Sequence, residues 1–385
     1  MYNFDVLLQR KNTDCTKWDA IERDYGKSDL MPFWVADADY PVLPEIGEAI
    51  SKRSDSSQTF GYTFAGNKYY SSVIKWNKKR HDLEITKDDI IPVPGVVTGI
   101  AIALLALTKE GDKVLINTPV YTPFFSVVRN LNRVLQESPL EKTDGRYCMN
   151  FRNIEQKFKE GTKAFILCSP HNPVGTVWSF EELRQLSVLC KKYQVLLISD
   201  EIHSDIVYKP AKHIPILNVD PDAILINSPS KTFNIAGLKG SVVFIKNRAL
   251  HKKYEDLVDA LHLYVNMFAL LATETVYTKG ELWLDEMLDY LRGNAEYVID
   301  FLKQRIPRVK AYIPESTYLL WLDFSDFGLS DEALETKIED EAKLALNPGT
   351  DYGKEYGQYM RINIACPRFY LEEGLEKLAV AFLNQ

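Results

Sequence analysis

The lysine at position 231 is the residue of this sequence best suited to covalent chemistry. It follows the apolar run Ala223–Asn227, in the segment Ser228-Pro229-Ser230-Lys231-Thr232. A lysine held inside a site forms imines with aldehydes, and burial lowers its pKa for that purpose. A surface lysine in a turn would have no such role. This segment alone favours neither interpretation over the other.

Two further polar residues follow apolar runs. Asp200 comes after Val195–Ser199 and could serve a metal, a base or a ring nitrogen; taken alone, it is better explained as the cap of a following helix. Asn172 comes after Ala164–Cys168, in a turn that two prolines and a glycine make rigid. A rigidly held amide suits recognition of a phenolic oxygen, although a plain turn is the simpler interpretation.

An anion site and an aromatic ring complete the set. The turn Pro94-Gly95-Val96-Val97 opens an apolar stretch, and free backbone N–H groups at such a helix start suit a phosphate. Tyr121 follows Lys113–Asn117 and could stack on a flat ring, or be a core tyrosine. A phosphate site, a stacking ring, an amide, a carboxylate and a lysine together suit a phosphorylated pyridine aldehyde.

Short apolar runs that alternate with helical stretches must position these residues. The runs are Lys113–Asn117, Ala164–Cys168, Val195–Ser199, Ala223–Asn227 and Ser241–Ile245. Strands that are apolar throughout, with helices such as Ser179–Tyr193 between them, predict an α/β fold with a mainly parallel mixed sheet covered on both faces. Ligands bind beyond the carboxyl ends of the strands in such sheets.

The C-terminal third predicts a smaller α+β part. It contains helical patterns at Leu282–Arg305 and Leu371–Leu383, with a strand pattern at Tyr318–Phe324 between them. We therefore expect a large cofactor-binding domain at residues 45–285. The smaller domain is expected to combine residues 1–44 with residues 286–385.

Composition excludes several classes of protein. The formal net charge of −7 is spread along the 385 residues, without the basic footprint of a nucleic-acid binder. The five cysteines are widely spaced and form no C-x-x-C, which argues against disulfides and zinc and favours the cytoplasm. Neither a secretory signal nor an apolar run that could cross a bilayer is found. The histidines lack metal-ligand spacing, and no nucleotide-binding motif occurs.

With these motifs in place, the sequence resembles the fold-type I, aspartate-aminotransferase-like pyridoxal-phosphate enzymes over nearly its whole length. The motifs that carry the resemblance are Gly95-Val96-Val97, Pro119-Val120-Tyr121, Asn172-Pro173-Val174-Gly175, Asp200-Glu201-Ile202-His203 and Ser228-Pro229-Ser230-Lys231. Within that superfamily the sequence is most similar to the cystathionine β-lyase branch related to MalY and PatB. The stretches that point there are Trp34–Pro41, Phe60–Thr63 and Arg361–Pro367.

The resemblance implies a role for each position of the cofactor site. Lys231 would carry pyridoxal 5'-phosphate and act as acid and base at Cα, with Tyr121 stacked on the ring as the second catalytic candidate. Asp200 would pair with the ring nitrogen, and Asn172 would bond the phenolic oxygen. The phosphate would be held by the residues Gly95, Val96, Val97, Ser228 and Ser230.

The resemblance also implies how the substrate is held. Arg361 would bind its α-carboxylate as a bidentate pair, and Ala36 is a second substrate-binding candidate. Tyr62 would reach into the neighbouring subunit's site, contacting cofactor and substrate there. The protein would therefore be a homodimer with shared active sites.

Two positions depart from the family pattern. Many members have an arginine that grips the phosphate eight residues after the lysine, and here the residue is Lys239, a point charge without the planar fork. Transaminases usually have a tyrosine three residues after the aspartate, and here it is His203, which either tunes the ring or is only structural.

The implied reaction is α,β-elimination from cystathionine, cysteine or cysteine S-conjugates, which gives a thiol, pyruvate and ammonia. Transamination would use the same residues, so the motifs alone leave it open as an alternative. A non-catalytic regulatory protein on this fold is the third possibility. Retention of Lys231, Asp200 and Arg361 together argues against it.

Overall fold

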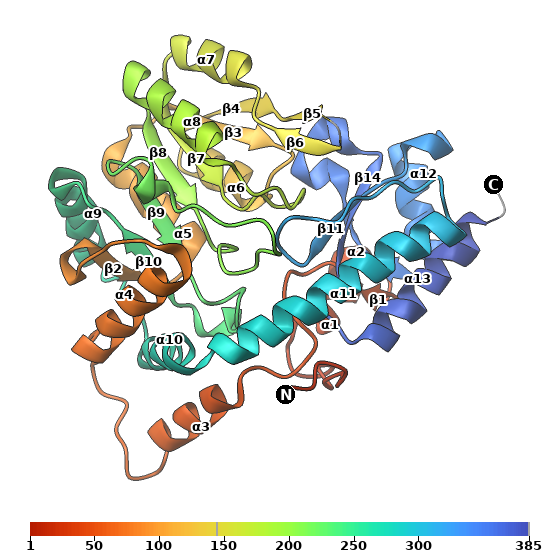
Figure 1. Ribbon diagram of the computed structural model, residues 1–385, viewed down its shortest axis with the longest axis horizontal. Coiled ribbons are helices and arrows are strands. Elements are labelled where there is room, and N and C mark those ends of the chain that lie inside the picture. The colour runs from red at the N-terminus through yellow and green to blue at the C-terminus, as the bar shows by residue number, and fades with distance from the viewer. Residues whose placement is uncertain (144, 384–385) are drawn as a thin grey trace. The chain divides into compact units, whose positions relative to one another are not determined.

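The computed structural model describes residues 1–143 and 145–383, which form two compact units (Figure 1). The larger unit comprises residues 42–171 and 176–284. The smaller comprises residues 1–41, the short segment Asn172–Gly175, and the chain from Asp285 onward. The segment that follows one strand of the larger unit is thus part of the smaller unit.

A mixed sheet forms the centre of the larger unit. Among the described residues it has seven strands, in the order β2-β10-β9-β8-β7-β3-β4. Its strands are β2 (Ile90–Val93), β3 (Lys113–Thr118), β4 (Val134–Pro139), β7 (Thr162–Cys168), β8 (Leu196–Asp200), β9 (Ile224–Asn227) and β10 (Ser241–Phe244). β10 is antiparallel to both its neighbours, β2 and β9, and the other pairs are parallel. The predicted α/β class with a mainly parallel mixed sheet is confirmed.

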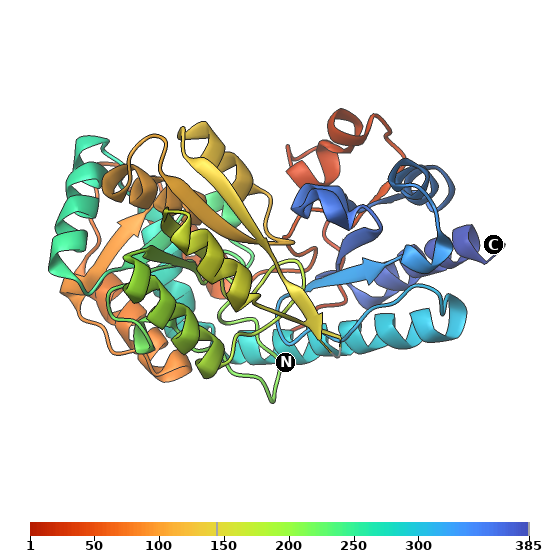
Figure 2. The ribbon, with the colours of Figure 1, turned by 90° about the horizontal axis from the view of Figure 1, so that it is seen from above.

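Helices cover both faces of this sheet, and Figure 2 shows the layers from above. One face packs against α5 (Val96–Leu107), α6 (Pro123–Asn130) and α9 (Arg248–Ala260), and the other against α7 (Phe151–Lys159) and α8 (Phe180–Tyr193). Ser179 caps α8 together with Glu182, so the predicted helix begins where its capping box lies. Burial on both faces explains why the central strands are apolar throughout.

The rest of the larger unit surrounds this core. Its other elements are α3 (Pro44–Arg53), α4 (Asn67–His81), η1 (Lys87–Asp89), β5 (Glu141–Thr143), β6 (Arg146–Cys148), η2 (Ile216–Asn218), η3 (Ala236–Leu238) and α10 (Met267–Lys279). α10 packs against α3 and α4. The loop between α3 and α4 extends away from the sheet (Figure 1).

The smaller unit is built on the antiparallel sheet β11-β14-β13. A parallel pair, β1 with β12, joins the N-terminal segment to it. Its elements are α1 (Thr16–Asp19), α2 (Ile21–Tyr25), β1 (Met31–Pro32), β11 (Leu319–Asp323), η4 (Ser325–Phe327), α12 (Asp331–Thr336), η5 (Lys337–Glu341), β12 (Leu344–Ala345), β13 (Asn347–Pro348), η6 (Gly349–Tyr352), η7 (Lys354–Tyr356), β14 (Tyr359–Asn363) and α13 (Arg368–Phe382). The long helix α11 (Glu281–Arg305) begins in the larger unit, and its Arg305 meets Glu376 of α13.

Candidate active site

The carboxyl ends of six strands meet at one edge of the large sheet, and one of the six is β4, which is parallel to β3. β3, β7, β8 and β9 are mutually parallel, and β2 runs the same way because β10 is antiparallel to both β2 and β9. Within the larger unit this edge carries Gly95, Tyr121, Asp200 and Lys231, each at or after a strand end. Topology therefore gathers residues that lie far apart in the sequence.

The carboxylate at the end of β8 is buried, and it forms a hydrogen bond with the backbone rather than with a cationic side chain. Asp200 is 2% exposed, and its Oδ1 accepts a hydrogen bond from the backbone N–H of Ile202 at 3.1 Å. Burial raises the pKa of Asp200 to about 7, and the nearby charge of Lys231 opposes that rise. Residues 202–205 form turns, so the alternative in which Asp200 caps a helix is wrong.

The neighbouring carboxylate is satisfied inside the protein. Glu201 accepts hydrogen bonds from Ser199 Oγ at 2.9 Å and the Ile216 N–H at 2.8 Å, and it meets His213 Nε2 at 2.7 Å. Glu201 therefore has a structural explanation. Asp200 is the carboxylate of this pair that suits an incoming cation.

The lysine loop after β9 is fixed by short polar contacts. Ser228 Oγ donates to the carbonyl of Gly240 at 2.6 Å and lies 2.9 Å from Ser230 Oγ. Thr232, next to Lys231, donates to Asp205 Oδ2 at 3.2 Å. Lys231 is partly exposed between two anchored neighbours. Such a lysine can react with a ligand while its backbone stays in place.

Asp205 anchors that loop to α4 as well. It accepts from Trp76 Nε1 at 3.1 Å and contacts His81 Nε2 at 2.8 Å. Burial alone would raise the pKa of Asp205, but the hydrogen bond and charge of His81 lower it below its ordinary value. Sequence reasoning missed this support, because no motif links residues so far apart.

The start of α5 provides backbone donors at the same edge. Gly95 is its N-cap, with φ of 145°, and no side chain caps the helix. An L side chain rarely adopts that conformation, which accounts for glycine at this position. Val96 and Val97 open the helix, where N–H groups are left for an anion. Their arrangement suits the predicted phosphate contact.

Two rings lie close to the end of β3. Tyr121 is partly exposed and its ring meets Phe124 edge-on at 5.9 Å. His171 Nε2 contacts the carbonyl of Pro119 at 2.7 Å, and burial lowers the pKa of His171 to about 4. The neutral imidazole therefore donates that hydrogen bond. It supports the backbone that leads to Tyr121, a role that the sequence did not indicate.

The three remaining candidates of the larger unit differ in exposure. His203 is 3% exposed and sits in the turn after Asp200. Lys239 is exposed, with φ of 57°, at the end of η3. Tyr62 is fully exposed in the loop between α3 and α4. A buried histidine can tune its surroundings, whereas the two exposed residues are available to ligands or to another chain.

The smaller unit holds the guanidinium of Arg361 by three hydrogen bonds. Nη1 donates to Asn172 Oδ1 at 3.2 Å, and Nη2 donates to the Trp34 carbonyl at 2.6 Å and to Asn347 Oδ1 at 2.5 Å. A guanidinium has five N–H groups. The Nε–H has no partner among the described residues, and one N–H remains on Nη1. Arg361 therefore still has donor capacity beyond these three hydrogen bonds.

Asn172 and Ala36 belong to the same surroundings. Asn172 is 3% exposed and lies in the short segment that packs with the smaller unit, where the Gly175 carbonyl accepts from Ser316 Oγ at 3.0 Å. Ala36, 9% exposed, is held by its carbonyl, which accepts from Tyr318 Oη at 3.0 Å. Asn347 is a residue that sequence reasoning missed, because nothing in its pattern marks it as a partner of Arg361.

The residues of the larger unit fit pyridoxal phosphate. Asp200, buried with its pKa near 7, suits a protonated pyridine nitrogen, and Lys231 suits the aldehyde. The uncapped start of α5 and the serines Ser228 and Ser230 suit the phosphate. In the described part of the chain, no cluster of three or more His, Cys, Asp or Glu side chains could hold a metal ion. Nor is any helix there both long and apolar enough for a membrane span.

Known proteins resemble this chain over nearly its full length. Residues 28–378 match the model of the family "Aminotransferase class I and II". Cystathionine β-lyase PatB of Bacillus subtilis is 38% identical, over 98% of this chain and 99% of PatB.

Solved structures agree with this match. The pyridoxal-phosphate-bound C–S lyase of Staphylococcus hominis is 33% identical and has a TM-score of 0.93, over 100% of this chain and 99% of the lyase. A pyridoxal-phosphate-bound protein of Clostridium difficile 630, provisionally named an aminotransferase, is 43% identical with a TM-score of 0.96, over 99% and 100% of the two chains. The predicted resemblance, including its lyase branch, is confirmed, and the chain belongs to the class I and II aminotransferase family.

Proposed function

We propose that this protein is a pyridoxal-phosphate-dependent carbon–sulfur β-lyase. It would act on cystathionine, cysteine or cysteine S-conjugates to give a thiol, pyruvate and ammonia. The observation that carries the proposal is Asp200, a buried carboxylate that needs a cation, at the same strand edge as Lys231. The names of the PatB and Staphylococcus hominis relatives support β-elimination as the reaction.

The strand edge of the larger unit would hold the cofactor and move the proton. When bound, pyridoxal phosphate supplies an electron sink for the negative charge that forms at the substrate Cα. Lys231 removes the Cα proton, and Asp200 keeps the ring nitrogen protonated. Tyr121 stacks on the ring. The first turn of α5, with Ser228 and Ser230, holds the phosphate.

The substrate would be oriented by the smaller unit. Arg361 would bind the α-carboxylate, and its three hydrogen bonds to the protein hold the guanidinium in place for that contact. Asn172 supports Arg361 and also bonds the cofactor's phenolic oxygen. Holding the carboxylate fixes which bond at Cα is weakened, because the oriented proton is the one that Lys231 removes. Elimination follows when the Cβ substituent is a thiolate, which leaves readily.

A product assay on L-cystathionine tests this proposal. We expect pyruvate and a thiol to appear with no keto acid present, and added pyridoxal phosphate to raise the rate of partly apo protein. L-Alanine is the control substrate, because it lacks a leaving group at Cβ. Strict dependence on a keto acid, with no pyruvate from cystathionine alone, would overturn elimination.

Transamination is the second candidate. It is favoured by the family description and by the name of the Clostridium difficile protein. There Lys231 would return the proton to the cofactor rather than leave the charge to expel a group from Cβ. Incubation with L-alanine and 2-oxoglutarate separates the two reactions, because only the transaminase forms glutamate.

The protein would work as a homodimer whose subunits share their sites. The loop between α3 and α4 exposes Phe60 (63%), Tyr62 (110%) and Phe64 (86%). Exposed aromatic residues at this density mark a surface for another chain. A second copy is the occupant that the resemblance implies, with Tyr62 entering its site. Buried free thiols at Cys168, Cys190 and Cys366 support a reducing compartment, the cytoplasm.

Mixed dimers test the shared site. Lys231→Ala and Tyr62→Ala each remove activity on their own, if both residues serve every site. Unfolding and refolding the two variants together would form hybrids in which one site has both native residues. We expect such mixtures to recover about a quarter of wild-type activity, as random pairing and one intact site per hybrid dictate. A mixture no more active than its parents would mean that Tyr62 serves its own subunit.

A further inference from the structure

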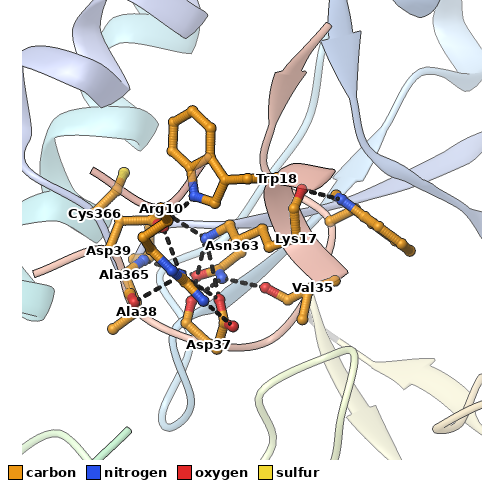
Figure 3. Close-up of polar contacts among 12 residues, drawn as sticks. Arg10, Lys17, Trp18, Val35, Asp37, Ala38, Asp39, Asn363, Ala365 and Cys366 are labelled. Carbon is orange, nitrogen blue, oxygen red and sulfur yellow. Dashed lines mark hydrogen bonds and ion pairs between the residues drawn. The ribbon is translucent and has the colours of Figure 1, made fainter. Parts of the chain in front are cut away.

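Two acidic side chains of the segment 34–39 meet two basic side chains from earlier in the N-terminal part of the chain (Figure 3). Arg10, Lys17, Asp37 and Asp39 form this N-terminal charge cluster. Arg10 Nη2 lies 2.6 Å from Asp37 Oδ2, and Arg10 Nη1 lies 2.7 Å from Asp39 Oδ1. Lys17 Nζ lies 2.6 Å from Asp39 Oδ2. The indole N–H of Trp18 also donates to Asp39.

The cluster is deeply buried and its formal charges balance. The side chain of Lys17 is 1% exposed and that of Asp39 is 0% exposed, whereas those of Arg10 and Asp37 are each 19% exposed. Burial by itself would lower the pKa of Arg10, but Asp37 and Asp39 together raise it well above its ordinary value. The Arg10 guanidinium therefore stays charged, and the cluster sets two basic side chains against two acidic ones.

Stability does not by itself account for so many buried charges. Replacing a buried ion pair with apolar side chains of similar volume is often neutral or stabilising. What charged groups add is direction, because their N–H donors must point toward acceptors. Charged residues at positions where apolar residues would serve stability equally well are thus candidates for positioning their neighbours.

The segment that this cluster touches has its carbonyl groups held one after another. Lys17 Nζ donates to the Asp37 carbonyl at 3.2 Å, and Arg10 Nη1 donates to the Ala38 carbonyl at 3.0 Å. Asn363 Nδ2 donates to the carbonyls of Val35 at 2.6 Å and Asp37 at 2.7 Å. Side chains rather than a neighbouring strand thus set the path of this segment.

Arg361 lies at the other end of the same segment. Its Nη2 donates to the Trp34 carbonyl at 2.6 Å. Tyr318 Oη donates to the carbonyl of Ala36, which lies between Trp34 and Asp37 in the chain. The indole N–H of Trp34 donates to the Lys17 carbonyl at 3.0 Å. A continuous chain of hydrogen bonds therefore leads from Lys17 and Arg10, through residues 34–38, to the guanidinium of Arg361.

We propose that the N-terminal charge cluster positions the segment 34–38 and, through the Trp34 carbonyl, the guanidinium of Arg361. Arg10 and Lys17 are thus positioning residues for recognition of the substrate carboxylate. This inference rests on the proposed function in one respect, that Arg361 binds the carboxylate. The inference gives Arg10 and Lys17 a role in substrate binding, although neither residue touches a reacting atom.

Substitution of the two basic residues tests the proposal in the holoenzyme. We expect Arg10→Met to raise KM for L-cystathionine by about ten- to a hundredfold, because small misplacements of a binding group cost rates of that order. kcat at saturation is expected to fall less than KM rises, since Lys231 itself is untouched. Arg10→Lys keeps the charge and recovers part of the KM. Lys17→Met changes the more deeply buried of the two residues, and Arg10→Met, at a partly exposed position, remains informative if Lys17→Met does not fold.

Lys27→Met is the matched control. Lys27 is another N-terminal lysine with two acidic partners, Glu339 at 2.6 Å and Asp340 at 3.0 Å. Both partners lie in η5, outside the segment 34–38. We expect its KM and kcat to equal those of wild type. A loss of melting temperature in Arg10→Met with an unchanged KM would reduce the cluster to a structural role and overturn the proposal.

Two readouts keep this proposal separate from the proposed lyase reaction. Hydrogen exchange of the amides of residues 33–40 is expected to quicken at least tenfold in Arg10→Met and not in Lys27→Met. The Kd of holoenzyme for L-alanine, followed by cofactor absorption, is expected to rise with the same pattern. If wild type forms no pyruvate from cystathionine, the lyase reaction fails while both readouts still decide the positioning role. Unchanged exchange and unchanged L-alanine affinity overturn it.

Discussion

Asp200 of the larger unit and Asp39 of the smaller unit are both buried carboxylates, but their surroundings are opposite. Asp39 is 0% exposed and meets Lys17, Arg10 and the Trp18 indole N–H at 2.6 to 2.9 Å. Asp200 is 2% exposed, and it accepts a hydrogen bond from the backbone N–H of Ile202. The first carboxylate is compensated within the fold, and the second is left with a raised pKa.

This difference separates a structural charge from a functional one. Folding removes both carboxylates from water at a cost, and the N-terminal charge cluster offsets that cost at Asp39 with protein cations. At Asp200 the cost stands until a cation arrives from outside. A protonated pyridine ring is such a cation. Burial alone would thus be a poor guide to a cofactor site, whereas burial without a compensating cation marks Asp200 as the candidate partner of a ring nitrogen.

The largest expected effect comes from removing the lysine at the uncompensated site. Lys231→Ala removes the group that moves the Cα proton, so kcat/KM for L-cystathionine should fall by at least ~10²–10⁴-fold. The absorption band of lysine-bound cofactor should be absent from the purified variant. Pyruvate formation and an absorption spectrum measure the two effects.

Lys252→Ala is the control for that variant. Lys252 lies on α9 and pairs with Asp256 four residues along the helix. Its removal should leave rate and spectrum unchanged. A Lys231→Ala protein that kept a wild-type rate would remove Lys231 from the mechanism, and Asp200 would then lose its role as partner of the ring.

The next effect concerns stability at the compensated site. Asp39→Asn leaves Lys17 buried without its 2.6 Å partner, so we expect the free energy of unfolding to fall by ~3–5 kcal/mol. Urea unfolding of the holoenzyme measures it. Asp24→Asn, which removes the partner of the exposed Arg23, should change little. If Asp39→Asn lowered the free energy of unfolding no more than Asp24→Asn does, Lys17 and Arg10 would not be stabilised by their pairing with Asp39.

At Asp200, in contrast to Asp39, replacing the carboxylate with an amide is expected to stabilise the protein. The folded pKa of Asp200, about 7, lies above the ordinary value of 3.8. The folded apoenzyme thus binds the proton more tightly than the unfolded chain, and stability falls as pH rises from about 4 to 7. Asp200→Asn has no proton to lose. It should stabilise the apoenzyme at pH 8 by on the order of 2 kcal/mol, and much less near pH 4.

Thermal unfolding of both apoproteins at several pH values measures this difference. The same substitution should lower the holoenzyme's activity, because asparagine cannot hold the ring nitrogen protonated. An Asp200→Asn apoprotein that melted lower than wild type at pH 8 would contradict the idea that ionised Asp200 burdens the fold. It would place Asp200 with Asp39 as a structural charge.

The sequence pattern marks the residues of the proposed cofactor site more clearly than those of the N-terminal charge cluster. Asp200, Lys231 and Gly95 follow strand ends, and parallel topology brings strand ends to one edge whatever the details of packing. Lys17 and Asp39 follow no such rule. A lysine in a short helix of an N-terminal segment looks like a solvated residue, because lysine is seldom fully buried.

Physical reasons also explain why the sequence pattern did not indicate some of the strands. β2 contains Pro92, and proline in a short apolar run argues against a strand unless that strand lies at the sheet edge, as β2 does. β4 is an edge strand with partly exposed residues. Asn172 follows β7 in sequence but packs with the smaller unit, since Gly175 approaches Pro314 closely. Such long-range packing leaves no local pattern.

The smallest expected effect concerns Lys239, an exposed cation near the uncompensated site. The carbonyl of Gly240, the next residue, is held by Ser228, so the backbone here is fixed even though the lysine side chain is exposed. An exposed point charge on a phosphate is screened by water and lacks the fork of an arginine.

We expect Lys239→Ala to weaken pyridoxal-phosphate binding to the apoenzyme less than about tenfold and to leave kcat at saturating cofactor unchanged. Lys239→Arg should tighten binding, and Lys246→Ala, at a lysine beyond the other end of β10 and outside the predicted site, should do neither. Reconstitution titrations followed by cofactor absorption decide the matter. A hundredfold loss in Lys239→Ala would mean that this lysine, rather than the backbone of α5 with Ser228 and Ser230, is the main phosphate contact.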